Sequence, residues 1–318
     1  MVPPVASPTV SLDTGPRRSP DPTPDFRPLA KIRLTWPAMH GTLRRRLAGW
    51  ASADLSFLLA SRGRPSRFPV TLTRRSDGRE FLVPHPCRLR FLAASLYSTE
   101  TLLGADAVDE ETDLLWGLAE TLEESLRSAF SEEEIRVRAT GGFPELKEPF
   151  LYAVSRRVRP RQVIETGVAQ GISTTFLLAA LHRNQGGRLR SIDYVHRDPS
   201  GWVDPASGVR DRSYVPQDRG SGWIVPRQLR DRWDLSEGKA EELLPRWSGA
   251  IDLFFHDSLH SPEHMRFEYD WALAHLVPGG VLVSDDIHWN PAFEEFVAAN
   301  AGTVRAVSTR YVGVAQRS

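Results

Sequence analysis

The chain of 318 residues contains a single cysteine, Cys87. One cysteine excludes a disulfide within the chain and fits a reducing compartment. No apolar run approaches the roughly 18 residues of a membrane-spanning helix. The start, Met1-Val2-Pro3-Pro4, lacks the basic and then apolar layout of a signal peptide. We therefore expect a cytoplasmic protein that does not enter the membrane.

The chain also lacks an excess of charge of either sign. Its 40 Lys and Arg residues balance its 40 Asp and Glu residues, for a formal net charge of +0. Proteins that bind nucleic acid through its phosphates usually carry a basic excess, so we do not expect a nucleic-acid partner. With 41% hydrophobic residues, the chain is long enough to bury a full core and to carry an appended domain.

The first 140 residues divide into two regions. Residues 1–28 are rich in Pro, Ser, Thr and Asp, with few large apolar side chains, and we expect a disordered tail. Residues 29–140 are expected to form an α+β accessory region. It includes a hairpin from Phe68 to Val83 and a helix from Glu110 to Phe130 that packs by a stripe of leucines. Its many arginines leave open a contact with the acidic helix, a homo-oligomer interface or a phosphate site.

The most informative run follows, from Val163 to Ser173. An apolar strand ends in Glu165, and a turn with Gly167 and Gly171 leads into a helix, to which Ser173 offers an N-cap oxygen. The spacing Glu-x-Gly-x-x-x-Gly-x-Ser differs from the dinucleotide fingerprint Gly-x-Gly-x-x-Gly. A carboxylate in place of a pyrophosphate repels phosphate and suits a cation or an amine. The sequence therefore predicts a nucleoside-binding turn whose ligand is not a dinucleotide.

This run resembles the first motif of the class I S-adenosylmethionine-dependent methyltransferases, whose cofactor carries an ammonium and a sulfonium. The resemblance extends over roughly the last 175 residues, the usual size of one domain, so we assign residues 141–318 to it. It implies that S-adenosylmethionine (SAM) is the cofactor. It also implies that Glu165, Gly167, Gly171 and Ser173 lie at the cofactor.

Three further positions complete the predicted cofactor site. Asp193 ends a short strand that follows the motif, and a carboxylate there can accept hydrogen bonds from both hydroxyls of a ribose. The resemblance places the adenine beside the turn at Lys239 and Ala240. Asp257 follows the next buried strand and is expected at the methionine end of the cofactor.

The order of the elements predicts the fold class. Strands alternate with helices from Val163 onward, which favours an α/β fold with a mostly parallel sheet. Two adjoining strands, Thr303 to Thr309 and Tyr311 to Gln316, close the chain as an antiparallel hairpin. This pattern matches the seven-stranded Rossmann-like sheet of the methyltransferase family, here with an N-terminal α+β extension.

Three acids follow buried strands and should share one edge of the sheet. Asp257, Asp285 and Asp286 would repel one another there without a cation, and Mg²⁺ prefers such hard oxygen ligands. The arrangement resembles the metal-dependent O-methyltransferases of the catechol type and those of natural-product sugars, which implies a metal bound by these three residues. Alternatively, Asp257 contacts only the cofactor while Asp285 and Asp286 cap the next helix.

Two histidines compete for the role of general base. His260 lies three residues after Asp257, where the catechol-type family carries a basic lysine, and His288 lies two residues after Asp286. An imidazole with a pKa near ~6.5 can accept a hydroxyl proton at neutral pH.

The sequence therefore favours a SAM-dependent methyltransferase that uses a divalent metal to O-methylate a hydroxylated small molecule. One alternative is an RNA or other macromolecule methyltransferase that uses the arginine-rich region. Another is a non-catalytic scaffold with a methyltransferase-like fold. The set of acids counts against the scaffold, which would need none of them.

Overall fold

The computed structural model describes residues 50–51, 69–84, 86–130, 147–194, 202–203, 210–211, 215, 218–309 and 311–318. The predicted disordered tail, residues 1–28, lies outside these ranges, as do residues 131–146. Within the described ranges, no helix combines the length and the apolar character needed to cross a membrane.

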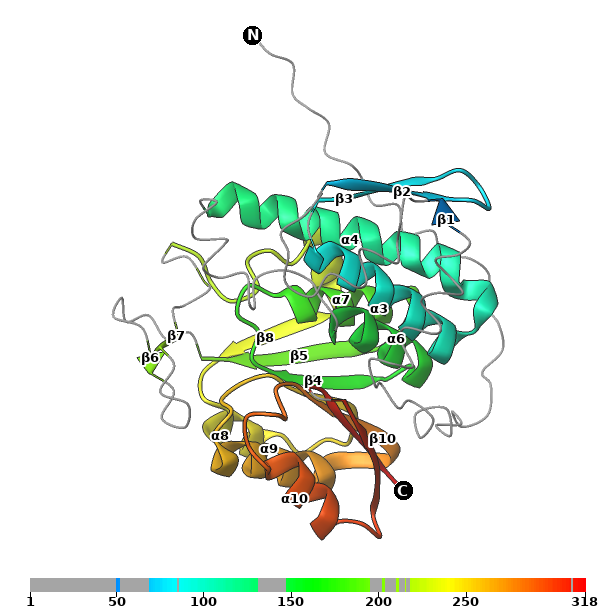
Figure 1. Ribbon diagram of the computed structural model, residues 1–318. Coiled ribbons are helices and arrows are strands. Elements are labelled where there is room, and N and C mark those ends of the chain that lie inside the picture. Colours follow the sequence, from blue (N-terminus) through cyan, green and yellow to red (C-terminus); the bar gives the residue numbers. More distant parts are fainter. Residues whose placement is uncertain are drawn as a thin grey trace.

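A seven-stranded sheet forms the centre of the molecule (Figure 1). Its strands, in chain order, are β4 (Gln162–Thr166), β5 (Arg188–Asp193), β8 (Trp233–Glu237), β9 (Ile251–His256), β10 (Leu276–Ser284), β11 (Val304–Ser308) and β12 (Gly313–Arg317). In space the order is β11-β12-β10-β9-β4-β5-β8. All pairs from β10 to β8 are parallel, whereas β12 runs antiparallel to both β10 and β11. The predicted α/β fold, including its antiparallel C-terminal hairpin, is confirmed.

The strand order reverses direction at β4. The chain continues from β4 to β5 and β8 on one side, then returns to β9 and β10 on the other. Open α/β sheets bind ligands outside the carboxyl ends of the strands at such a reversal. A ligand site is therefore expected at the carboxyl ends of β4, β5, β9 and β10.

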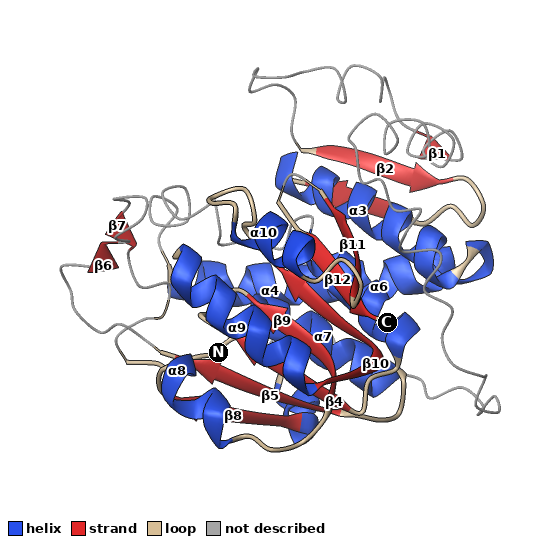
Figure 2. Ribbon diagram, turned by 90° about the horizontal axis from the view of Figure 1, so that it is seen from below, coloured by secondary structure: helices blue, strands red, loops and turns tan. Residues whose placement is uncertain are grey.

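Helices cover both faces of the sheet (Figures 1 and 2). On one face lie α6 (Lys147–Val158) and α7 (Ile172–Arg183), with α3 (Pro86–Leu103) and α4 (Val108–Ala129) packed outside them. On the other face lie α8 (Ala240–Leu243), α9 (Pro262–His275) and α10 (Ala292–Ala299). Short 3₁₀ helices complete the described helical elements: η2 (Ala105–Ala107), η3 (Arg227–Arg232) and η4 (Leu244–Arg246).

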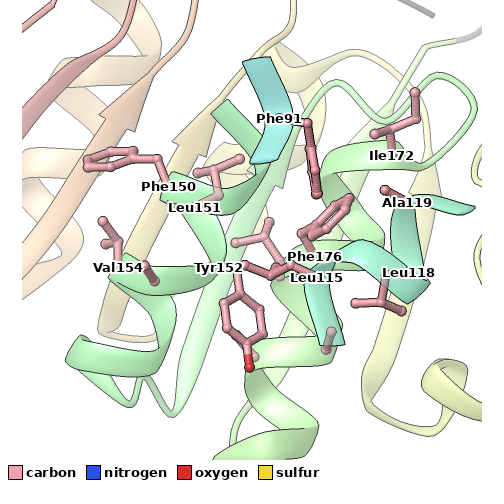
Figure 3. Packing of buried hydrophobic residues seen from close by; sticks show 14 of the residues in the cluster. Phe91, Leu115, Leu118, Ala119, Phe150, Leu151, Tyr152, Val154, Ile172 and Phe176 are labelled. Carbon is pink, nitrogen blue, oxygen red and sulfur yellow. The ribbon is translucent and has the colours of Figure 1, made fainter. Parts of the chain in front are cut away.

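Side-chain alternation along the strands divides the core in two. Val163 of β4 and Phe255 of β9 point toward α6 and α7, whereas their neighbours Ile164 and Phe254 point toward α9 and α10. Figure 3 shows the first core, where aromatic and aliphatic side chains of α3, α4, α6 and α7 interdigitate, among them Phe91, Leu115, Tyr152 and Phe176. The strands are thus buried on both faces, as their near-continuous apolar runs predict.

Of the accessory elements, the predicted hairpin and the predicted helix after it are present, whereas α3 and β1 were not predicted. The hairpin consists of β2 (Val70–Arg74) and β3 (Glu80–Val83), and β1 (Trp50–Ala51) adds a short third strand to it. The predicted helix is α4, which buries its leucine stripe. Between β5 and β8 a small antiparallel pair forms from β6 (Trp202–Val203) and β7 (Arg210–Asp211).

One predicted boundary was wrong at the start of α7. Ser173 was expected to cap this helix, but α7 begins at Ile172 with Gly171 as its N-cap, ahead of Ser173 and its neighbour Thr174. The two hydroxyl residues lie inside the first turn. They are held there because both hydroxyls bond to the buried carboxylate of Glu165.

A buried carboxylate, that of Glu111, joins α4 to α6. Glu111 of α4 accepts a hydrogen bond from the Tyr152 hydroxyl of α6 and pairs with Arg156, whose Nη2 lies 2.9 Å from Oε1. Burial and the nearby Glu111 charge raise the pKa of Tyr152 well above its usual value, so the phenol stays protonated and donates. This contact joins residues 41 and 45 positions apart in the chain.

We predict that Glu111→Ala lowers the free energy of unfolding by about 3 kcal/mol. It removes the only acceptor of the Tyr152 hydroxyl that the described contacts show and the charge partner of Arg156, which keeps its hydrogen bond to Asn184. The neighbouring variant Glu110→Ala removes an exposed ion pair with Arg183 and should change stability by less than about 1 kcal/mol. Urea denaturation of both variants measures the difference. Equal stabilities would show that α4 does not depend on this contact.

Candidate active site

The turn after β4 requires glycine at both predicted positions. Gly167 has a φ of +85°, and a Cβ built on it would lie 1.9 Å from the carbonyl oxygen of Asp257. Gly171 has a φ of +101°, and its Cβ would lie 2.5 Å from the Val225 side chain. Any side chain would therefore push the turn away from the end of β9 or from the segment around Val225. The turn is pressed between these two neighbours.

Glu165 supports this turn from inside the protein. Its side chain is fully buried, and its carboxylate accepts hydrogen bonds from the hydroxyls of Ser173 (3.0 Å), Thr174 (2.8 Å) and Ser191 (2.6 Å). Burial raises the pKa of Glu165 to about 7 despite these bonds. The sequence analysis placed Glu165 and Ser173 against the cofactor. In the structure their side chains bond to each other behind the turn, so they shape the cofactor site without facing it.

Asp193 connects the turn to the segment before β8. Its Oδ1 accepts a hydrogen bond from the backbone N–H of Val168 at 3.1 Å, and its Oδ2 accepts one from the Ser221 hydroxyl. Burial raises the pKa of Asp193. Asp193, the residue predicted to bind the ribose, therefore lies at the end of β5, directly beside the glycine turn.

The two residues predicted beside the adenine lie next to Asp193. The backbone N–H of Gly238 donates to the Asp193 carbonyl at 2.9 Å, which brings the following turn to the end of β5. Lys239 is the N-cap residue of α8, and its ammonium lies 5.7 Å from the centre of the Tyr194 ring. Ala240 is buried at the first position of α8. The structure thus gathers Gly167, Asp193, Lys239 and Ala240 at one stretch of the sheet edge.

A second group of charges lies beside the turn, at the ends of β9 and β10. Lys147, the first residue of α6, places its Nζ 2.6 Å from Asp257 Oδ2 and 2.5 Å from Asp285 Oδ2. Asp257 also donates its backbone N–H to the Thr166 carbonyl at 2.9 Å, and its own carbonyl faces Gly167. Asp257 is therefore the residue that links this charged group to the glycine turn, which we call the cofactor turn below.

The charges in this group interact strongly because they are mostly removed from water. Burial opposes the charge of Lys147, but Asp257 and Asp285 outweigh it and raise its pKa well above the usual value. Burial also opposes ionisation of Asp285, yet Lys147 holds its pKa below the usual value. Burial raises the pKa of Asp257 to about 6 and that of Asp286 to about 7, the latter with the added repulsion of Asp285. One ammonium does not fully compensate three carboxylates.

Asp286 adopts a strained backbone conformation. Its φ is +49°, a value that residues with a side chain rarely adopt. Strain of this kind persists where the surrounding structure holds it, often at functional sites. Here Ile287 donates its N–H to the Tyr311 carbonyl at 3.0 Å, which fixes the loop after β10 against the C-terminal hairpin.

The two predicted histidines lie at this edge in different surroundings. His260 is buried, and its Nε2 lies 4.0 Å from Asp257 Oδ1, beyond hydrogen-bond distance and without another partner among the described residues. Burial lowers the pKa of His260 to about 3, so its imidazole is neutral. His288 is partly exposed, with Nδ1 3.7 Å from Asp286 Oδ1 and its ring edge-on to Tyr311 at 4.8 Å.

Behind His260 lies a buried network that the sequence analysis did not identify. Glu268 of α9 contacts His256 Nδ1 at 2.6 Å and His264 Nε2 at 2.8 Å, and it accepts hydrogen bonds from the hydroxyls of Thr166 and Ser258. The two histidines hold the pKa of Glu268 below its usual value although burial opposes this. The i,i+4 spacing of His264 and Glu268 on a helix was the only sequence signal for this network.

The predicted magnesium site does not fit the arrangement of its ligands. A cation shared by Asp257 and Asp285 would need the position between their carboxylates, and the Lys147 ammonium lies there. Across the residues that the structure describes, no three His, Cys, Asp or Glu side chains are arranged to hold a metal ion. Lys147 was missed from the sequence because nothing in its local pattern connects it to strands more than 100 residues away.

The high pKa of Glu165 makes a prediction about stability. An acid whose pKa rises on folding, here from 4.5 to about 7, binds its proton more tightly in the folded state, so the fold loses stability as pH rises through this range. Replacing it in Glu165→Gln removes this loss. Between pH 5 and pH 8 the variant should gain about 2 kcal/mol relative to the original protein, which urea denaturation at both pH values measures. A difference that does not change with pH would contradict the assigned shift.

Comparisons with known proteins agree with this arrangement. A family model described as a methyltransferase domain matches residues 164–287. No curated protein matches the chain by sequence. Among solved structures, a methyltransferase of Podospora anserina with bound S-adenosylhomocysteine (SAH) has 16% identity and a TM-score of 0.44, covering 63% of this chain and 87% of its own.

Two further solved structures are O-methyltransferases. The enzyme from Bacillus cereus, in complex with SAH, has 16% identity and a TM-score of 0.43 over 71% of this chain and 97% of its own. The other enzyme, from Streptomyces achromogenes, is involved in tomaymycin synthesis and is in complex with SAM. It has 19% identity and a TM-score of 0.41, covering 63% of this chain and 90% of its own.

The conclusion comes from the family match together with the sheet. The matched residues run from β4 through the glycine turn to the acids after β10, and so include the candidate site apart from Lys147 and His288. The sheet, with seven mostly parallel strands and an antiparallel C-terminal hairpin, is the one that the resemblance implied. Residues 164–287 therefore match a methyltransferase domain, and the sheet that carries them supports a class I, SAM-dependent methyltransferase fold.

Proposed function

We propose that this methyltransferase transfers the methyl group of SAM to a hydroxyl oxygen of a small molecule. The observation that carries the proposal is the position of Asp257. Its backbone is pressed against the cofactor turn at Gly167, while its side chain belongs to the charged group with Lys147 and Asp285. A hydroxyl bound at that group would lie next to the cofactor, and methyl transfer depends mainly on such positioning, worth up to roughly 7 to 11 kcal/mol.

In this proposal His260 accepts the proton of the acceptor hydroxyl. Its Nε2 is buried, has no partner among the described residues and lies beside Asp257. Burial keeps the ring neutral, so Nε2 can accept the hydrogen of a hydroxyl, but it also makes the ring a weak base. Proton transfer therefore depends on the nearby carboxylate of Asp257, which stabilises the protonated ring. His288, partly exposed and bound against Tyr311, is assigned to the entrance of the site.

Aromatic side chains around this entrance support a ring-shaped acceptor. Trp289 and Tyr311 are among the few large hydrophobic side chains that are substantially exposed, at 44% and 42%. Trp289 lies 5.1 Å from His260, and Tyr311 lies against His288. Exposed aromatic faces beside a polar group favour a flat partner with hydroxyls, such as a phenol-like ring or a sugar. Magnesium is not part of this proposal, because Lys147 occupies its position between the acids.

The proposal predicts a specific kinetic effect of His260→Ala. Loss of a general base should lower kcat by about 10²- to 10⁴-fold, while the Kd for SAH, measured by calorimetry, stays unchanged because the cofactor turn is intact. Screening hydroxylated phenols and sugars with SAM, and detecting methylated product by mass spectrometry, supplies the acceptor for this assay.

His275→Ala is the matched control. This histidine lies at the far end of α9, stacked on Trp271, and its replacement should leave kcat unchanged. An unchanged kcat in His260→Ala would remove His260 from the mechanism. Failure of the original protein to bind SAH would contradict the proposed function as a whole.

A further inference from the structure

We propose that Lys147 takes the place of a divalent cation in this protein and that its ammonium binds the acceptor hydroxyl. This inference rests on the proposed O-methylation. It assigns to a side chain of α6 the positive charge that the sequence pattern of Asp257, Asp285 and Asp286 attributes to a metal. The protein then needs no metal ion for methyl transfer.

The geometry of the ammonium supports this role. An ammonium has three N–H donors and no acceptor. Two of them are directed at Asp257 Oδ2, at 2.6 Å, and Asp285 Oδ2, at 2.5 Å, which leaves one to donate to a ligand. The Lys147 side chain as a whole is 26% exposed, whereas its ammonium lies among the buried carboxylates, so solvent reaches the stem of the side chain beside the charged group.

The charges also explain why lysine and metal exclude each other. Asp285 is 8% exposed and its carboxylate depends on Lys147 for compensation. Mg²⁺ binds carboxylate oxygens at about 2.0 to 2.1 Å, so a cation between Asp257 and Asp285 would displace the ammonium from the same two oxygens. The displaced Lys147 would then have to leave both of its carboxylate partners, and no other acidic partner bonds to its ammonium among the described residues. The Lys147 ammonium therefore occupies the position between the carboxylates of Asp257 and Asp285, which a metal ion would need.

An unpartnered nitrogen, His260 Nε2, lies near the charged group of Lys147. His260 Nε2 is buried without a partner and lies 4.0 Å from the other oxygen of Asp257. One hydroxyl placed here can accept the third N–H of Lys147 and donate its own hydrogen to His260. A single acceptor hydroxyl would thus provide a hydrogen-bond partner both for the third N–H of Lys147 and for His260 Nε2.

The chemical step balances with these residues alone. The O–H bond of the acceptor breaks, and its proton moves to His260 Nε2. The oxygen forms a bond to the methyl carbon while the bond from that carbon to the sulfonium breaks, so SAM becomes SAH. Lys147 stays protonated and stabilises the negative charge that develops on oxygen, as preorganised donors do in other active sites.

Binding of Mn²⁺, followed by the electron paramagnetic resonance signal of the free ion, tests the inference without an assay of activity. Mn²⁺ is a hard cation that suits carboxylate ligands. The original protein should bind it weakly. Lys147→Ala leaves Asp257 and Asp285 without compensation and should bind Mn²⁺ about tenfold or more tightly, and Asp285→Asn in that background should abolish the gain. Lys147→Met, which keeps the length of the side chain, should show the same gain if Lys147→Ala is poorly folded.

Arg266→Ala is the matched control, since it removes a cation from an exposed ion pair with Glu295 on α9 and should not change Mn²⁺ binding. Tight Mn²⁺ binding by the original protein that is lost in Asp285→Asn would overturn the inference, and so would equal affinities in the original protein and Lys147→Met. Calorimetry with SAH separates the two proposals. SAH binding with tight Mn²⁺ binding refutes only the role of Lys147, whereas absence of SAH binding refutes the proposed function.

Discussion

The site depends on one ion-pair group, in which the Lys147 ammonium lies between the carboxylates of Asp257 and Asp285. Two carboxylates placed at the ends of adjacent buried strands lose much of their hydration, a cost of several kcal/mol per ion unless an opposite charge compensates it. Lys147 provides that charge from the first residue of α6. The start of α6 and the ends of β9 and β10 are therefore held together by charge. Because the carbonyl of Asp257 faces Gly167, this group also sets the position of the cofactor turn.

Two buried carboxylates, one on each face of the sheet, hold the residues behind this edge in place through hydrogen bonds. Glu165 bonds to hydroxyls of α7 and β5 on one face, and Glu268 contacts His256 and His264 on the other. Polar networks of this kind are stabilising only when their members find partners, and they then fix the side chains that they connect. The residues that face ligands, such as Asp193 and His260, can therefore be presented from a rigid frame.

The sequence predicted most of the fold because its signals are local. The apolar strands, the glycine turn and the closing hairpin each appear within a few residues, and the parallel topology places Asp257, Asp285 and Asp286 on one edge. Strand alternation could have corrected the role of Glu165, since it shares a face with Val163 and so points toward α7. By the same rule Thr166 and His256 point toward α9, where Glu268 lies.

The role of Lys147 could not be predicted in this way. It stands at the start of a helix, 110 residues before Asp257 and 138 before Asp285, and only the packed fold brings the three together. Three acids without a visible partner indicate a missing positive charge, and a metal was the reasonable interpretation from sequence. Which cation supplies that charge depends on a contact between distant segments, so a local pattern does not decide between a metal ion and a side chain.

The most direct test of the account is the rate of methyl transfer by metal-stripped protein in excess EDTA, compared with the rate after Mg²⁺ is added. If Lys147 supplies the positive charge at this site, the two rates should be equal. A rate that falls to background in EDTA and returns with Mg²⁺ would contradict the account and restore the metal to the ends of β9 and β10.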